Sequence, residues 1–267
     1  MIVTFNPDLI LLKKSISNLK SFYIFISDNG SNNIDGIKKI IKDVPNTNLV
    51  LNKSNVGIAT AQNRSLLRII RSKEINFVLF LDQDSLITEN SVKKLHSDFL
   101  ETNDKNLAIL SAISSNQLDK GHGIINVNEC ISSGMLVSIA AIKEVGLMMD
   151  SLFIDMVDYE WCWRFIKKGW HVAVDYNVQF NHQIGNHKIV LKRIEIAPFR
   201  LYYVFRNTIF LIRNNKTINR RQTHFWINYL LKLFVFNVIF CSDRIKRFEF
   251  IKKGVVDAIK GKLGKLT

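Results

Sequence analysis

Two carboxylates, Asp82 and Asp84, follow directly after the apolar run 77–81. Five consecutive apolar residues predict a buried strand, and the two acids then lie at its carboxyl end. In open α/β sheets, ligands bind at that edge. Carboxylates one residue apart can share a hard divalent cation, which in turn takes oxygens from a substrate diphosphate. The same triplet is also common as a turn with a helix cap, so it needs support from the rest of the chain.

Three other polar clusters follow predicted strands. They are residues 4–7, residues 28–31 and residues 55–63, the last of which opens a helix of small residues. Each has a purely structural explanation, such as an Asx-turn, a helix cap or close packing. The carboxyl ends of parallel strands meet at one edge of a sheet, however, and four such clusters together favour a shared site there.

The elements that must position these residues alternate between strand and helix. Apolar runs predict strands at 1–5, 22–27, 48–51, 77–81 and 107–113, and amphipathic segments predict helices at 9–19, 35–42, 57–72 and 91–100. This rhythm predicts an α/β fold with a mostly parallel sheet and helices on both faces.

The rhythm changes after residue 120. We expect a hairpin or loop at 121–127, strands at 131–138, 171–174 and 178–181, and helices at 155–168, 194–213, 222–241 and 244–262. Asp155 is a plausible N-cap of the helix at 155–168, and Glu160 and Arg164 form an i,i+4 pair within it. The predicted domains are an α/β domain over 1–190 and a basic helical region over 191–267.

The net charge of +14 is concentrated in the C-terminal region. Residues 1–185 hold 19 basic and 19 acidic residues, whereas residues 186–267 hold 18 basic and 4 acidic residues. This asymmetry favours contact with a polyanion, either an anionic membrane or nucleic acid, although a solvated basic face has the same composition. The apolar stretch 225–241 is short for a membrane span, and Lys232 lies near its middle. It predicts a helix at a membrane interface, or one packed on the domain or in a dimer contact.

The three cysteines have neither metal-ligand spacing nor a disulfide pattern, which predicts a reducing, cytoplasmic compartment. The first residues show no signal-peptide pattern.

The ordered set of motifs resembles glycosyltransferase family 2, and especially its bacterial rhamnosyltransferase branch. The resemblance covers roughly residues 1–215, and the segments that carry it are 3–7, 28–31, 55–63, 80–85, 133–134, 153–160, 182–185 and 202–207. It implies the nucleotide-diphospho-sugar transferase fold, the glycosyltransferase A type. It also implies an inverting transfer from a nucleotide-diphospho-sugar.

The resemblance also implies residue roles. The implied nucleotide-sugar-binding residues are Thr4, Asn6, Asp28, Asn29, Asn55, Gly57, Asn63, Asp82 and Gln83. The implied acceptor-side residues are Gly134, Glu160, Trp161 and Arg164. Asp84 and His182 would bind Mg²⁺ or Mn²⁺, and Asp158 would be the general base that inversion requires. Asp155 and Glu160 compete for that last role, and Val157 stands where many relatives have an acid.

The function expected from the resemblance is transfer of L-rhamnose from dTDP-rhamnose to a lipid-linked surface polysaccharide, an O-antigen or a capsule. The protein would then lie on the inner face of the bacterial plasma membrane, as a possible homodimer. A UDP-sugar donor (galactofuranose, glucose or N-acetylhexosamine) is the alternative within the same chemistry. Two alternatives do not involve sugar transfer: the protein could be an inactive relative that acts in assembly, or a nucleic-acid-binding module. The chain has no nucleic-acid motif, so we expect no nucleic-acid partner.

Overall fold

The computed structural model describes residues 1–115, 121–182, 189–191, 193–214 and 218–266, with the backbone alone for His182, Arg193 and Ile194. Its first part is a parallel sheet in the order β3-β2-β1-β5. The strands are β1 (Ile2–Thr4), β2 (Ile24–Asp28), β3 (Thr47–Leu51) and β5 (Leu81–Asp82). The connecting helices are α1 (Leu9–Asn18), α2 (Ile34–Ile41) and α3 (Ile58–Ile69). Thr4 is in register with Asp28, and Val3 with Asp82, so the predicted clusters do end at one edge.

A second, mixed sheet continues the fold in the order β4-β9-β7-β10-β6, with β8 paired to β10. Its strands are β4 (Phe77–Leu79), β6 (Ser85–Leu86), β7 (Leu107–Ser114), β8 (Ile124–Asn126), β9 (Met135–Ser138) and β10 (His171–His182). Strands β7 and β10 run parallel, whereas the β4–β9, β7–β9, β6–β10 and β8–β10 pairs are antiparallel. The helices of this part are α4 (Glu89–Glu101), α5 (Ile139–Val145) and α6 (Val157–Lys167). The α/β prediction is confirmed, and the antiparallel pairs are concentrated in this second sheet.

Several predicted elements differ in detail. The predicted strand 77–81 is divided, because β4 pairs with β9 while β5 pairs with β1, so the chain passes between the two sheets at Phe80. The predicted strands 171–174 and 178–181 are one strand, β10, with a register shift between Asp175 and Gln179. Helix α5 was not predicted. Asp155 is not the N-cap of α6, since Met156 takes that position without a side-chain cap bond.

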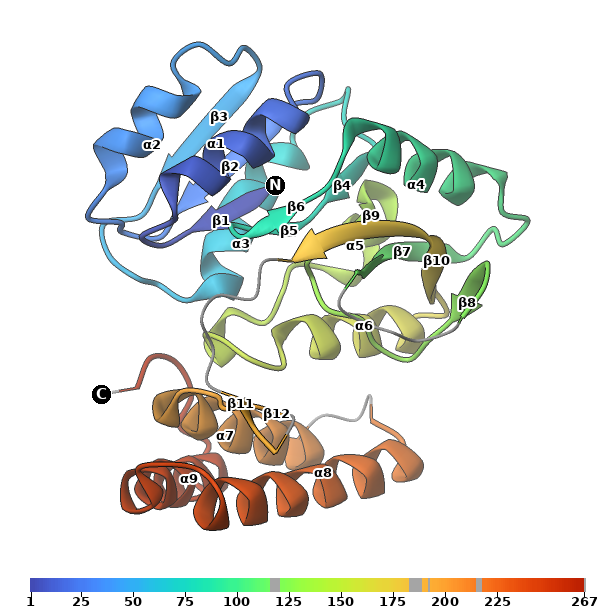
Figure 1. Ribbon diagram of the computed structural model, residues 1–267. Coiled ribbons are helices and arrows are strands. Elements are labelled where there is room, and N and C mark those ends of the chain that lie inside the picture. Colours follow the sequence, from blue (N-terminus) through green and yellow to red (C-terminus); the bar gives the residue numbers. More distant parts are fainter. Residues whose placement is uncertain (116–120, 183–188, 192, 215–217, 267) are drawn as a thin grey trace.

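Three helices near the C-terminus form a separate layer below the α/β body in Figure 1: α7 (Pro198–Asn214), α8 (Arg220–Ile239) and α9 (Arg244–Ile259). The short strands β11 (Ile189–Val190) and β12 (Arg193–Ile194) precede them. Leu201, Phe205, Leu230 and Ile251 form the core between the three helices. Arg247, which follows shortly after the apolar stretch 225–241, is buried and ion-paired to Glu195 at 2.9 Å. None of the helices in the described ranges is long and apolar enough to cross a membrane.

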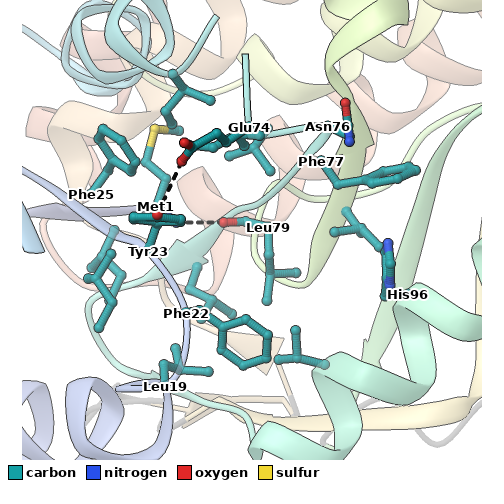
Figure 2. A pocket seen from close by; sticks show the side chains of 18 of the residues that line it. Met1, Leu19, Phe22, Tyr23, Phe25, Glu74, Asn76, Phe77, Leu79 and His96 are labelled. Atoms are coloured by element: carbon teal, nitrogen blue, oxygen red, sulfur yellow. Dashed lines mark hydrogen bonds between the residues drawn. The ribbon is translucent and has the colours of Figure 1, made fainter. Parts of the chain in front are cut away.

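An apolar cavity of about 400 Å³ lies at the amino ends of β1 and β4, the sheet edge opposite the predicted clusters. Figure 2 shows its lining, where the Met1 amino group donates to the Leu79 carbonyl at 2.7 Å and the Tyr23 hydroxyl donates to Glu74 at 3.2 Å. The predicted site residues do not line this cavity.

Candidate active site

The carboxylate of Asp28 organises the end of β2. The Thr4 hydroxyl donates to its Oδ1 at 3.0 Å, and the amides of Gly30 and Ser31 donate to its Oδ2 at 3.1 and 3.0 Å. Asp28 is buried. Three of the roughly four lone-pair sites of a carboxylate are therefore occupied, and the turn after β2 is fixed to β1.

Asn29 and Asn55 join this turn to the start of α3. The side-chain NH₂ group of Asn29 donates to Asn55 Oδ1 at 3.1 Å, and the same oxygen accepts from the backbone amide of Gly57 at 3.0 Å. Gly57 has φ +86°, and a Cβ placed there would lie 2.6 Å from the carbonyl oxygen of Phe153. The Ile58 amide donates to that oxygen at 2.7 Å. Glycine is therefore required at this position, both for its backbone conformation and for the close approach of the 152–156 segment.

Asn6 and Gln83 connect the loops after three strands. The Asn6 amide donates to the Ser31 hydroxyl, and Asn6 Oδ1 accepts from the Asn32 amide, both at 2.8 Å. Gln83 Oε1 accepts from the Phe5 amide at 2.8 Å. These bonds gather the ends of β1, β2 and β5 into one polar surface.

The Asp82–Ser85 turn is held from behind by Ser133. Its hydroxyl accepts from the Asp82 amide at 3.1 Å and lies 2.8 Å from the Ser85 hydroxyl. Gly134 (φ +90°) permits the close packing of β9 here, since a Cβ would meet Phe180 at 2.6 Å. The backbone of His182 is in register with Ser85, directly after Asp84, and the side chain of His182 is outside the description.

Asp158, in the first turn of α6, has both carboxylate oxygens oriented by the backbone. The Ser132 amide donates to Oδ2 at 3.1 Å, and the Tyr159 amide donates to Oδ1 at 3.0 Å. The pKa of Asp158 is raised from 3.8 to about 6, mainly by burial. The two amides lower this pKa, and the negative charge of Asp82 raises it further. Asp158 and Asp82 come from distant parts of the chain, and the adjacent residues Ser132 and Ser133 bind one of them each.

Helix α7 fixes the 152–156 segment that leads into α6. The Asn207 side-chain amide donates to the carbonyls of Leu152, Ile154 and Asp155 at 3.0, 2.8 and 2.9 Å. Phe153, Asp155 and Met156 all have positive φ, between 64° and 68°. Such backbone persists only where its surroundings enforce it. Asn207 of the 202–207 motif therefore holds the segment that leads into α6 and positions Asp158.

Four of the implied site residues have structural contacts elsewhere. Asn63 both donates to and accepts from the backbone of Met148, at 2.8 and 3.0 Å. Glu160 is buried and forms the predicted pair with Arg164 at 2.7 Å. Trp161 is fully buried, and its indole N–H donates to the Gly146 carbonyl at 2.9 Å. On α6, Trp161 and Arg164 thus bind backbone carbonyls of the 145–147 segment, while their acceptor-side role stays a prediction.

Arg200, in the first turn of α7, is a residue of this site that sequence reasoning missed. Its guanidinium binds the Asp155 carboxylate through Nε and Nη2, and the Arg200 side chain is 44% exposed. In the sequence, nothing distinguishes it from the other basic residues of 186–267.

The donor set of this edge suits a hard cation only in part. Among the residues that the structure describes, no group of three or more His, Cys, Asp or Glu side chains is arranged to hold a metal ion. The carboxylates of one turn are nevertheless the ligand type of Mg²⁺ and Mn²⁺, which use one or two protein carboxylates together with substrate phosphates.

Comparison with known proteins agrees with this geometry. The chain is 29% identical to a dTDP-rhamnosyl transferase, RfbF, of Shigella flexneri, over 98% of this chain and 94% of that protein. No model of a known protein family matches. Among solved structures, residues 1–349 of S. aureus TarS in complex with UDP-GlcNAc superpose with a TM-score of 0.62 and 14% identity, over 98% of this chain and 80% of that one. The mannosyltransferase PcManGT of Pyrobaculum calidifontis, in complex with GDP-Man and Mn²⁺, also gives 0.62, with 11% identity over 99% and 75%. The chain is a glycosyltransferase with the A-type fold, and it resembles the enzymes of family 2.

Proposed function

We propose that the protein is an inverting glycosyltransferase that moves L-rhamnose from dTDP-rhamnose to a hydroxyl group of a lipid-linked polysaccharide. The choice of dTDP-rhamnose as the donor is supported by the similarity to a dTDP-rhamnosyl transferase along 98% of the chain. The bonded loops around Asp28, Asn29 and Asn55 would bind the pyrimidine nucleotide. Asn6 and Gln83 would close the same pocket from β1 and β5.

Asp158 is the proposed general base. The acceptor hydroxyl would lose its proton to Asp158 while its oxygen attacks the anomeric carbon, and the bond from that carbon to the diphosphate oxygen would break on the opposite face. A carboxylate with a pKa of about 6 is a stronger base than an ordinary aspartate, yet it is ionised at neutral pH. Because two amides orient its oxygens, the base would be in place before the acceptor arrives.

Asp84, with Asp82 and His182 beside it, would hold the divalent cation. The Mn²⁺ in the PcManGT complex supports this assignment for the fold. When bound, such a cation stabilises the negative charge of the departing nucleoside diphosphate.

Helix α8 is the proposed membrane-facing element. Its exposed apolar side chains include Phe225, Leu231 and Ile239, at 59%, 59% and 51% exposure. Lys232 on α8 and Arg244 and Lys246 at the start of α9 are exposed beside them. Apolar and basic groups on one face suit an anionic bilayer, in which a lipid-linked acceptor would reside. Co-sedimentation with anionic but not with neutral vesicles, lost in Phe225→Ser/Leu231→Ser, is expected. A stable dimer in solution that loses its contact in the same variant would assign the face to a second copy instead.

Calorimetric titration tests the donor and the metal together. We expect dTDP-rhamnose to bind wild type in a Mn²⁺-dependent manner, and Asp84→Ala to remove that dependence. The matched control is Asp35→Ala, because the Asp35 side chain is 94% exposed on α2. Tighter binding of a UDP-sugar would change the donor, a possibility that the UDP-GlcNAc complex of TarS keeps open. Absence of binding by every nucleotide sugar with metal present would refute the proposal.

A further inference from the structure

The guanidinium of Arg200, at the edge of the candidate active site, uses only some of its hydrogen-bond donors to bind Asp155. A guanidinium has five N–H donors in a rigid fork, and two of them face the Asp155 carboxylate. The Arg200 side chain is 44% exposed, so an incoming ligand can reach it.

Asp155 gives this guanidinium a fixed support. The carbonyl oxygen of Asp155 accepts from Asn207 at 2.9 Å, and its φ of 64° belongs to the segment that α7 holds in place. The carboxylate is only 10% exposed, so it is anchored where Arg200 meets it. An arginine held on one side by a buried carboxylate is oriented for bidentate binding of a second anion on the other side.

The surroundings of Arg200 are acidic. Burial lowers the pKa of Arg200, but the charges of Asp155, Asp82 and Asp158 act in the opposite direction and leave it raised. A diphosphate entering between those carboxylates would be repelled unless cations compensate, and Arg200 supplies one from the protein itself.

We propose that Arg200 binds the β-phosphate of the nucleotide-sugar donor, with Asp155 holding its guanidinium in position. This inference rests on the proposed function. The β-phosphate is the relevant group because its oxygen is the one that leaves the anomeric carbon, and that carbon must lie between the donor turn and Asp158. Arg200 lies beside that position because it binds Asp155, three residues before the proposed base.

The test compares dTDP with dTMP, which lacks the β-phosphate, in calorimetric titrations of wild type and Arg200→Ala with Mn²⁺ present. Loss of a hydrogen-bonded charged partner is expected to weaken dTDP binding by about ten- to one-hundredfold. Binding of dTMP is expected to change by less than about threefold. Arg200→Lys keeps the charge without the planar fork, so an intermediate loss is expected for dTDP. The matched control is Arg71→Ala, an exposed arginine beyond the far end of the 12-residue helix α3.

Three results would overturn the inference. Equal weakening of dTDP and dTMP binding would give Arg200 a structural role in the 152–156 segment. Unchanged dTDP binding in Arg200→Ala would remove Arg200 from the donor site while leaving the proposed function intact. If wild type binds no dTDP, the proposed function fails, and this inference fails with it.

Discussion

Replacing Asp158 with asparagine is expected to slow sugar transfer strongly and, at neutral pH, to stabilise the fold. The folded-state pKa of Asp158 is raised from 3.8 to about 6, so the folded protein disfavours the ionised carboxylate. At 1.36 kcal/mol per pKa unit, a shift of about 2 units corresponds to about 3 kcal/mol at most. This unfavourable contribution is fully present above about pH 6 and disappears below about pH 4, because the unfolded chain loses its proton first.

Two effects reduce the stabilisation expected for Asp158→Asn. The asparagine NH₂ group cannot accept from the Ser132 or the Tyr159 amide, so one hydrogen bond is lost, at about 1 kcal/mol. Partial exposure of the carboxyl group screens the remainder. We therefore expect a net stabilisation of about 1–2 kcal/mol at pH 7.5, which for a chain of this size raises Tm by about 3–6 °C.

Thermal unfolding followed by circular dichroism from pH 4 to 8 measures this effect, and a transfer assay on the same samples measures activity. Loss of the general base is expected to reduce kcat by about 10²- to 10⁴-fold. Asp35→Asn, which changes an exposed acid, controls for the loss of one charge. A Tm for Asp158→Asn below that of wild type at pH 7.5, or a difference that does not shrink on acidification, would refute the reasoning.

Three further outcomes are expected. Asn207→Ala leaves the carbonyl groups of Ile154 and Asp155 without their donor, whereas the Leu152 carbonyl still accepts from Arg206; it should lower the unfolding free energy by about 2–3 kcal/mol in urea titrations, with a higher KM for the donor; an unchanged KM would separate that segment from donor binding. Gly57→Ala should destabilise more than Gly169→Ala, because both positions have φ +86° but only Gly57 has a neighbour, Phe153, at 2.6 Å; equal Tm values would contradict this. Burial, and the hydrogen bond that the protonated Asp175 carboxyl donates to Asp98, raise the pKa of Asp175 to about 6, so Asp175→Asn should raise Tm above pH 6 and leave it unchanged near pH 4; a loss of Tm at pH 8 would oppose this.

Much of the first half could be predicted because the pattern there is local. Apolar runs of strand length, separated by amphipathic helices, define α1 to α4 within a few residues. The Thr88 side chain, for instance, accepts from the Ser91 amide three residues later and caps α4. The division of 77–81 could not be predicted, because it depends on β9, which comes much later in the chain and pairs with β4 but not with β5.

The candidate site divides in the same way. Asp28, Asn29, Asn55 and Gly57 follow predicted strands; Asp28 binds the Gly30 amide in its own turn, and Asn55 binds both Asn29 and Gly57. The Glu160–Arg164 pair follows from helical spacing, but the bond from Trp161 to the Gly146 carbonyl does not, because spacing shows which residues share a face and not which neighbour that face meets.

By itself, the sequence determined the α/β class, the edge at which the polar clusters gather and the resemblance to family 2 glycosyltransferases, because strand ends and short motifs are local features. Tertiary structure alone decided that Ser132 orients Asp158, that Asn207 holds the 152–155 segment, and that Arg200 reaches Asp155. Each of these contacts joins residues far apart in the chain. Their geometry, and with it the raised pKa of the proposed base, exists only once β9, α6 and α7 have packed together.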